Sequence, residues 1–440
     1  MNSDGSQAHR FIKSEPGYIL TQPMWFPNGR RILYVKFHQG GGRTSVIAES
    51  RKLDGSDPVV LLSDPDATSL SWGQPGRLIV SAIEPPPNQG DSNLWDLRYN
   101  LEAGKSEGNL RRLTNWQGFG FSDIHATADG KLLLFSNLHL RSAVLVGALK
   151  NGGSSMEKPQ SLTLNERDNW PTGWSSESNS VLFYSDVSGA FDVYKQEINE
   201  HSAIDLVSNL NDKWAPQLSP DGNWIVYMSW PKPTAAAPNP PGKLMRTPVS
   251  GGPEEFIADI PDHDFVGSTQ GGFPSFRCPL HRGDCVLAED DAGKGIAFTA
   301  FDPVKGLGSQ VTKVAGYPPF LSWDLAPDGS RIAVSSFDYK TADIQIISTS
   351  SGSAQKFSVL PWNELIAVAW TADGRGLFLS SDSSRGSSIL RYDLKGQPRL
   401  LWKTGWDIQQ LTPSPDGHYL ALGPQVYDEN AWIIPNFPAH

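Results

Sequence analysis

One short pattern recurs along the whole chain, and it constrains the fold more than any other feature of the sequence. Each copy has a few residues of mixed polarity, a turn of the Pro-Asp-Gly type and then a nearly continuous apolar stretch. Asp or Asn in such a turn can accept hydrogen bonds from backbone amides, and Gly supplies the positive φ that suits a tight hairpin. Each copy therefore predicts a β-hairpin. Nine copies are found, at residues 24–37, 70–83, 124–137, 173–186, 217–230, 275–290, 324–337, 369–382 and 413–425.

The spacing of the copies predicts how the hairpins assemble. Successive copies begin about 44 to 58 residues apart, which is the spacing of propeller blades. Further strand-like stretches such as DIQIIST and RRLTNW follow the hairpins, so each copy predicts a four-stranded antiparallel sheet. An isolated sheet of this kind cannot bury both faces, and several must stack around an axis. We therefore predict an all-β fold, a single β-propeller domain over residues 1–440 with nine blades, or with eight if Cys278–Asp290 belongs to an insertion.

The ends of the chain suggest how the ring closes. The last copy has candidates for its second and third strands but none for a fourth, and His9–Pro16 resembles an orphan fourth strand. Pairing the two ends would leave no exposed sheet edge. We expect residues 9–23 to supply the closing strand and the start of the first blade. A division into two smaller propellers is the alternative, although no linker separates the copies.

Composition and charge narrow the function classes. The chain contains 42 Gly, 34 Pro and 15 Trp with 19% charged residues, which favours many short strands over helices. Its net charge is −10 and no Lys/Arg cluster stands out, so we expect no nucleic-acid partner. No apolar run is long enough to span a bilayer, and the polar start MNSDGSQAHRF is not a secretory signal. We expect either a cytosolic protein or a domain trimmed from a longer exported or membrane-anchored parent.

The two cysteines bear on the cellular compartment. Cys278 and Cys285 flank the turn-like segment PLHRGD, and on a hairpin such positions can face each other within disulfide reach. Two free thiols or half of a zinc site are the alternatives, but zinc needs about four ligands and only His281 is nearby. A disulfide would imply an oxidising compartment, whereas free cysteines would favour the cytoplasm.

Signatures of catalysis are missing from the sequence. A serine hydrolase of the prolyl-oligopeptidase type needs a Gly-x-Ser-x-Gly elbow, and a kinase needs its Gly-rich, His-Arg-Asp and Asp-Phe-Gly segments. The Gly-rich QGGGRTS at residues 39–45 lacks the Lys-Ser/Thr ending and is interpreted as a hairpin loop. His263 lies between two aspartates in PDHDF, where calcium binding is an alternative to a solvated loop. We predict no catalytic residue, no metal and no cofactor.

Tryptophan recurs in the connections between copies. These loops emerge on the face that usually forms a propeller's ligand mouth, together with acidic residues. Each indole can wedge between neighbouring blades and bury ~150–250 Å², or it can line a mouth that takes a protein, peptide or glycan. Both interpretations remain open. The candidate ligand-binding residues are Trp116, Trp170, Trp214, Trp362, Trp406, Asp123, Asp168 and Asp212.

The repeats resemble a known family. The turn SPDG (Ser219–Gly222), the apolar strand after it and a Leu-Thr-type fourth strand resemble the TolB-type propeller repeat, which also occurs in prolyl-oligopeptidase-family enzymes. Residues 93–116, 244–255 and 285–308 resemble the C-terminal regions of bacterial regulators in which a eukaryote-like Ser/Thr kinase or a winged-helix domain precedes the propeller, usually across a transmembrane helix. The resemblance implies a non-catalytic, extracytoplasmic sensor or interaction domain, which we expect to be monomeric. The alternative is a hydrolase or lyase with its active site in the central channel, or the propeller of a prolyl-oligopeptidase-family protein.

Overall fold

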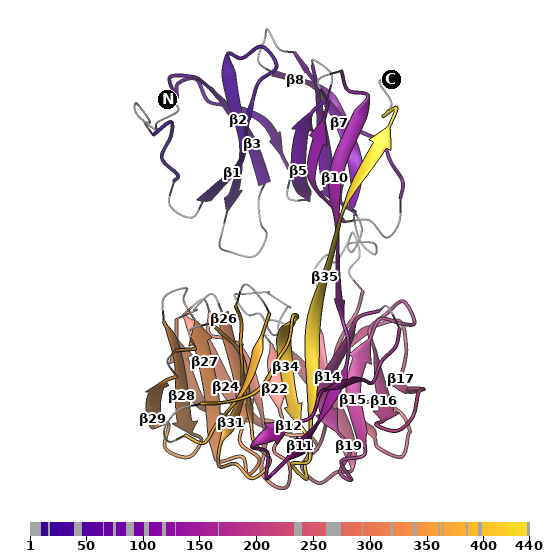
Figure 1. Ribbon diagram of the computed structural model, residues 1–440, viewed down its shortest axis with the longest axis vertical. Helices are drawn as coiled ribbons and strands as arrows, with labels where there is room; N and C mark the ends of the chain where they lie inside the picture. Colours follow the sequence, from indigo (N-terminus) through magenta and orange to yellow (C-terminus); the bar gives the residue numbers. More distant parts are fainter. Residues whose placement is uncertain are drawn as a thin grey trace. The chain divides into compact units, whose positions relative to one another are not determined.

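The computed structural model consists of β-strands joined by turns and loops (Figure 1). It describes residues 10–437 except 16–17, 39–45, 65, 74–75, 85–91, 101–104, 117–119, 128, 166, 233–239, 261–273, 293, 317–319, 338–340, 360, 363, 384–385 and 395–397. The predicted all-β class is confirmed. Over the described residues, no helix is long and apolar enough to cross a membrane.

All nine predicted hairpins are present as antiparallel strand pairs. The Pro-Asp-Gly turn acts as expected in the copy at residues 217–230. Gly222 has a φ of 72°, and the Asp221 carboxylate accepts a hydrogen bond from the Asn223 backbone N–H at 3.1 Å. The recurring turn is therefore a structural device of the hairpin.

The chain divides into two compact units, one of Met1–His139 with Tyr427–His440 and one of Leu140–Val426, where the sequence analysis expected a single domain. Within the described residues the first unit contains three sheets. Two of them run β1–β4 and β5–β8, and in the third β10 lies between β9 and β35. The bounds are β1 Tyr18–Trp25, β2 Arg31–His38, β3 Val46–Lys52, β4 Val59–Ser63, β5 Ala67–Trp72, β6 Arg77–Ile83, β7 Ser92–Asn100, β8 Lys105–Arg112, β9 Phe121–Ala126, β10 Leu132–Ser142 and β35 Tyr419–Pro435.

The second unit contains six sheets among the described residues. One combines β34 and β35 with β11, to which the short β12 and β13 are added, and the others run β14–β17, β18–β21, β22–β25, β26–β29 and β30–β33. The bounds are β11 Leu145–Lys150, β12 Ser155–Met156, β13 Gln160–Ser161, β14 Asn169–Trp174, β15 Ser180–Ser185, β16 Asp192–Glu197, β17 Ile204–Val207, β18 Asp212–Leu218, β19 Trp224–Trp230, β20 Gly242–Pro248, β21 Glu255–Ile260, β22 Ser275–Arg277, β23 Cys285–Asp290, β24 Gly295–Asp302, β25 Gly306–Ala315, β26 Phe320–Leu325, β27 Arg331–Phe337, β28 Ala342–Ser348, β29 Ala354–Ser358, β30 Leu365–Trp370, β31 Leu377–Ser381, β32 Ser388–Tyr392, β33 Arg399–Lys403 and β34 Asp407–Pro413.

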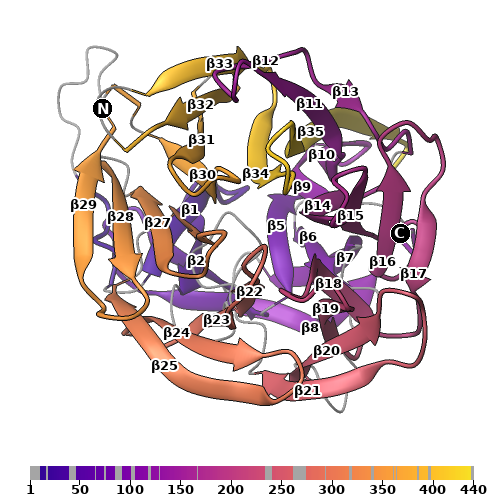
Figure 2. The ribbon, with the colours of Figure 1, turned by 90° about the horizontal axis from the view of Figure 1, so that it is seen from below.

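Buried apolar clusters join each sheet of the second unit to the next, so its six described sheets form a closed ring (Figure 2). For example, Trp174 and Val181 of one sheet pack with Ala421 of its neighbour. The strands after the turns are buried on both sides because blades cover both of their faces; every residue of β15 and β31 is buried. The propeller class is confirmed, whereas the count of nine blades is not.

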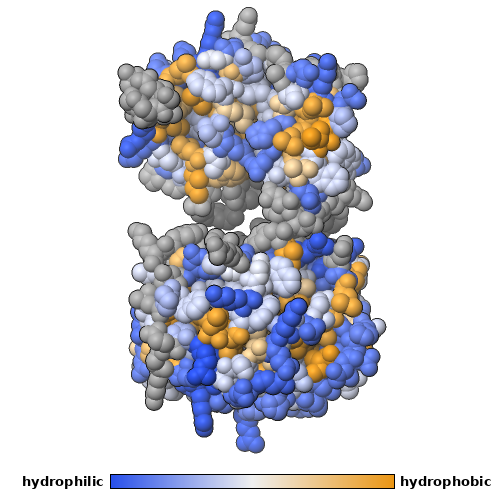
Figure 3. Space-filling view, viewed as in Figure 1, coloured by the Kyte–Doolittle hydropathy of each residue, from blue (hydrophilic) through white to orange (hydrophobic). Residues whose placement is uncertain are grey.

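The outermost strands differ from the inner ones in polarity. Most residues of β8, β29 and β33 are exposed, with sequences such as KSEGNLRR and AQKFS. Charged and polar side chains on an edge strand discourage pairing with other chains. In the view of Figure 3, polar side chains accordingly cover much of the visible surface of each unit, and apolar ones form separate patches.

Ring closure in the second unit differs from the expected pairing of the chain ends. β35 pairs with β11, in a register that places Leu422 opposite Leu145. The described part of residues 9–23 lies elsewhere: Tyr18 begins β1, which pairs with β2, and Glu15 forms an ion pair of 3.2 Å with Lys36. The physical reason is that LVGALK buries Leu145 and Leu149 in the core of the ring, whereas residues 11–15 line a cavity that contains the charged Lys36 and Arg51.

Candidate functional site

A cavity of about 250 Å³ lies in the second unit, and its wall contains residues from β14, β18, β22, β26, β30 and β34, the first strand of each sheet. Figure 2 labels five of these strands, β14, β18, β22, β30 and β34, at the inside of the ring. The lining residues belong mainly to the later part of each strand and to the turn after it, including Ser176, Ser219, Pro327 and Pro415. The cavity therefore lies at the hairpin-turn end of the inner strands.

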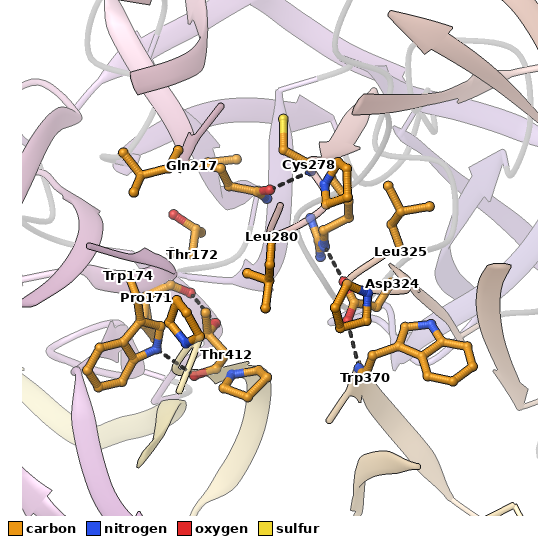
Figure 4. Close-up of a pocket in the computed structure, with 18 of the residues that line it drawn as sticks. Pro171, Thr172, Trp174, Gln217, Cys278, Leu280, Asp324, Leu325, Trp370 and Thr412 are labelled. Carbon is orange, nitrogen blue, oxygen red and sulfur yellow. Dashed lines mark hydrogen bonds and ion pairs between the residues drawn. The ribbon is translucent and has the colours of Figure 1, made fainter. Parts of the chain in front are cut away.

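Bulges in the inner strands help to direct polar side chains into this cavity. The register shifts between Trp214 and Gln217 in β18 and between Ile408 and Gln410 in β34. A bulge inserts an extra residue and changes the direction of the side chains after it. Both glutamines line the cavity. Gln217 also joins two blades, because its Nε2 donates to the Phe276 carbonyl at 3.1 Å and its Oε1 accepts from the Cys278 N–H at 2.9 Å (Figure 4).

An arginine and an aspartate from neighbouring blades meet in the cavity wall, and Figure 4 labels the aspartate, Asp324. Arg277 ends β22 and Asp324 lies in β26; Arg277 Nε is 3.4 Å from Asp324 Oδ1, and the two side chains are 24% and 18% exposed. The guanidinium lies over the Trp323 ring, 5.4 Å from its centroid, and Nη1 donates to the Phe276 carbonyl at 2.9 Å. Among the described lining residues these are the one arginine and the one carboxylate.

Burial dominates the electrostatics of this pair. It raises the pKa of Asp324 to about 6, although the Arg277 charge and the hydrogen bond from the Trp370 backbone N–H oppose the rise. That bond, from Trp370 N to Asp324 Oδ2, is 2.7 Å long and joins β30 to β26. Burial also lowers the pKa of Arg277, which nevertheless stays protonated because a guanidinium does not lose its proton in proteins. The carboxyl group of Asp324 therefore titrates at a higher pH than an ordinary aspartate, while Arg277 keeps its positive charge.

Tyr184 and Gln410 add a second polar pair to the wall. Burial raises the pKa of the Tyr184 hydroxyl, the Asp168 charge raises it further, and a hydrogen bond with Gln410 lowers it. The charges of Tyr184 and Arg277 influence each other's pKa, so these groups converge on one region. Gln410 Oε1 is buried and has no hydrogen-bond partner among the described residues.

The turn after β22 forms part of the mouth. A disulfide joins Cys278 to Cys285, as the sequence predicted, with an S–S distance of 1.98 Å. It closes a turn from which Pro279, Leu280 and His281 line the cavity. The Leu280 N–H donates to the Pro327 carbonyl at 3.0 Å, which fixes the turn against the next blade, and Figure 4 shows the Leu280 side chain inside the cavity.

Apolar surface makes up most of the remaining wall, with Trp174, Trp214 and Trp370, several prolines, Leu325 and Leu411. An apolar cavity with a few convergent polar groups is the usual form of a ligand site. No group of three or more His, Cys, Asp or Glu side chains is placed to hold a metal ion in the part of the chain that the structure describes. The arrangement can hold a small ligand that has one anionic group and an apolar body.

The structure does not bring the predicted ligand-binding residues together. Of the tryptophans, Trp214 lines the cavity, where it packs against Phe191 at 4.9 Å between ring centroids. Trp362 packs against a buried cluster between two blades, and Trp170 lies half-buried in β14. Trp406 is 46% exposed, and Trp116 is 37% exposed in the first unit, 5.7 Å from the Phe121 ring.

Two of the predicted aspartates accept hydrogen bonds from segments more than twenty residues away in the sequence. Asp168 Oδ1 accepts from the Ser142 N–H at 2.9 Å, and Asp212 Oδ1 accepts from the Phe191 N–H at 3.0 Å. Burial and the neighbouring Asp186 raise the pKa of Asp168 to about 6. Asp123 is exposed in the first unit. Their role as ligand contacts stays a prediction. The PDHDF cluster and the Gly-rich loop at residues 39–45 lie outside the described residues.

Sequence reasoning missed Arg277 and Asp324. A signal for Asp324 was present, because it stands four residues before the turn residue Asp328, where the equivalent residue before Asp221 is the uncharged Gln217. When one copy of a repeat has a charged residue at an inner-strand position that is uncharged in the other copies, that residue is a candidate for a functional role. Arg277 had no such signal, since its copy diverges from the others.

The ring of antiparallel sheets is a β-propeller by its own topology. The chain is also similar to several solved structures. The chain is similar to TolB from Acinetobacter baumannii, with 11% identity, 80% of each chain covered and a TM-score of 0.42. It is also similar to a puromycin hydrolase (16% identity, 80% of this chain and 57% of that chain, TM-score 0.37) and to the Dos1 propeller (10% identity, 82% and 92%, TM-score 0.37). No family model and no curated protein matches the chain.

Proposed function

We propose that this chain is a non-catalytic binding propeller that holds its ligand in the cavity of the second unit. The observation that carries the proposal is the wall itself, to which the first strand of all six described sheets contributes. A ligand there would contact every blade of the ring at once, and its binding would stabilise the ring as a whole.

The proposal includes a role as the extracytoplasmic sensor or interaction domain of a bacterial signalling protein. The disulfide between Cys278 and Cys285 supports an oxidising compartment. The partner is then a peptide or the exposed end of a protein that fits a cavity of about 250 Å³. The alternative is a glycan that binds at the tryptophan-bearing loops. The experiment described next distinguishes the two ligand classes.

The test blocks the cavity without changing the rest of the ring. Leu280→Trp adds bulk to a side chain that projects into the cavity, whereas Leu307→Trp makes the same change at an outer-strand position that is 48% exposed. A pool of di- and tripeptides and oligosaccharides is screened by saturation-transfer NMR. We expect the bound compounds to lose at least about tenfold in affinity, roughly 1.4 kcal/mol, with Leu280→Trp and to keep their affinity with Leu307→Trp. Ligands that bind Leu280→Trp with unchanged affinity but no longer bind Trp406→Ala would contradict the proposal. They would indicate a binding site at the tryptophan-bearing loops.

A channel hydrolase is the second candidate, because Asp324 has a pKa near neutrality in a cavity, as acid–base groups often do. The same peptide pool distinguishes it. Recovery of intact peptides after long incubation is the result expected of a binding propeller. Cleavage that disappears in Asp324→Asn would favour the hydrolase.

A further inference from the structure

We infer that the cavity recognises the α-carboxylate of an apolar residue, with Arg277 as its anchor. Such a group occurs at the C-terminus of a peptide and in a free amino acid. The inference rests on the proposed function, because it names the chemistry of the ligand that the cavity takes.

The guanidinium of Arg277 has unused donors. It carries five N–H groups, of which Nη1 uses one on the Phe276 carbonyl and Nε is near Asp324. Nη2 has no hydrogen-bond partner among the described residues. The stem is fixed, since the guanidinium lies over the Trp323 ring and the indole Nε1 of Trp323 donates to Ser275 Oγ at 2.9 Å. A fixed fork of donors in a cavity is suited to a carboxylate, which it can bind through two parallel hydrogen bonds.

Asp324 acts as a positioning residue for this anchor. Its Oδ2 is occupied by the Trp370 N–H, and its Oδ1 lies 3.4 Å from Arg277 Nε, on one edge of the guanidinium. This loose contact compensates the buried cation while the cavity is empty. It leaves the Nη edge to the ligand. The Asp324 carboxylate also repels the carboxylate of the ligand. Removal of the Asp324 charge should therefore strengthen the binding of an anionic ligand.

Gln410 supplies the complementary acceptor. Its Oε1 is buried without a partner among the described residues and lies in the same wall. An unsatisfied buried acceptor costs free energy, and a ligand N–H would satisfy it. The amide N–H next to the carboxylate of a peptide's last residue, or the ammonium of an amino acid, carries such a donor. Arg277 and Gln410 thus offer one cavity a donor for a carboxylate and an acceptor for an N–H.

The rest of the wall defines the body of the ligand. Leu280, Leu325, Leu411 and Trp370 line the cavity, so an apolar side chain fits beside the polar groups. A volume of about 250 Å³ is small for a ligand site and suits one or two residues. The surroundings select an apolar residue, and the arginine selects its free carboxylate.

The experiment compares an acid with its amide. N-acetylleucine, N-acetylleucine amide and free leucine are titrated into the whole protein, with calorimetry and with tryptophan fluorescence, to which Trp174, Trp214 and Trp370 in the wall contribute. We expect N-acetylleucine to bind roughly 10- to 100-fold more tightly than its amide, the range of a charge-assisted hydrogen bond. Tighter binding of free leucine than of N-acetylleucine identifies an amino acid as the source of the carboxylate; the reverse order identifies a peptide end.

Matched variants assign the preference to Arg277. Arg277→Gln should abolish the difference between acid and amide, and binding of the amide that remains measurable in this variant shows that the cavity is folded. Arg277→Lys should restore part of the difference. Arg282→Gln, at an exposed arginine on the same disulfide-closed turn, should behave like the wild type. Asp324→Asn should tighten N-acetylleucine binding several-fold.

Three results would overturn the inference. They are equal affinity of acid and amide, an acid preference that persists in Arg277→Gln, and no binding of any of the three probes at millimolar concentration. The proposed function fails separately, when the wider pool contains no ligand that Leu280→Trp excludes.

Discussion

At the scale of single residues, the second unit buries carboxylates beside other carboxylates. Burial raises the pKa of Asp382 to about 7; the charges of Asp407 and Glu364 add to the rise, and a hydrogen bond from the Ser387 hydroxyl opposes it. A raised pKa in the folded state means that the folded protein holds a proton that the unfolded chain has lost. The stability from this protonated carboxyl is complete below about pH 4 and is lost as the pH rises through 7.

Asp382→Asn tests this pH dependence. The free energy of unfolding of the wild type should fall between pH 4 and pH 8, by up to about 4 kcal/mol from this group. The variant has no charge to bury, so its stability should be higher than that of the wild type at pH 8, and its pH dependence should be flatter. Urea unfolding across this pH range measures both. Asp205→Asn, at an exposed position, should follow the wild type, and a steeper fall in Asp382→Asn would contradict the assignment.

At the scale of elements, the turn between β22 and β23 is the most constrained segment of the cavity mouth. The Cys278–Cys285 disulfide spans it, and the Leu280 N–H is bonded to the next blade. Short loops of this kind restrict the unfolded chain when they are cross-linked. The turn thereby combines a stability role with the placement of Leu280 in the cavity.

Replacement of both cysteines tests the turn. Cys278→Ser with Cys285→Ser should lower the free energy of unfolding by about 2–3 kcal/mol, as expected from chain entropy for a short loop. Chemical denaturation of the variant and the wild type under non-reducing conditions measures the difference. A variant as stable as the wild type, or two reactive thiols in denatured wild-type protein, would show that the bridge does not form.

At the scale of the whole molecule, the ring of the second unit is closed by strands from both of its ends. β11 begins at Leu145 and pairs with β35 through Leu422, and β35 also pairs with β34. Leu145, Leu149, Leu420 and Leu422 are all buried in one core cluster. The unit therefore depends on residues that are far apart in the sequence.

Two fragments test this closure. A fragment of residues 140–426 contains the whole closing sheet and should unfold cooperatively in urea. A fragment of residues 163–426 lacks β11, β12 and β13, so that β35 has an unpaired edge and the core loses Leu145 and Leu149. We expect its urea midpoint to be much lower, since each buried leucine contributes several kcal/mol. Equal midpoints would contradict the observed closure.

The repeat predicted the hairpins well because each hairpin depends on neighbouring residues. All nine strand pairs and the turn at Gly222 follow from local chemistry, and so does the disulfide across a short turn. Assignment of the copies to rings does not follow, because every copy carries the same pattern. The third copy shows this: β9 lies in the first unit, whereas β11 pairs in the ring of the second unit.

The candidate site was harder to predict than the fold. Its ion pair joins Arg277 to Asp324, which are distant in sequence and meet only because consecutive blades place their inner strands around one axis. Recurrent tryptophans were visible in the sequence, but only Trp214 among the five lines the cavity. Position in a repeat predicts which face a loop belongs to, and not which side chains converge.

The division of the chain also sets an order of events during synthesis. The first unit contains residues from both sides of the second, and its last described residue, Phe437, is buried against Phe121, Leu133 and Phe135. When residue 426 has been synthesised, every strand of the second unit has been synthesised too. The third sheet of the first unit still lacks the last residues of β35. Because domains generally fold as units, the amino-terminal sheets can complete this core only after the chain has passed through the whole second unit.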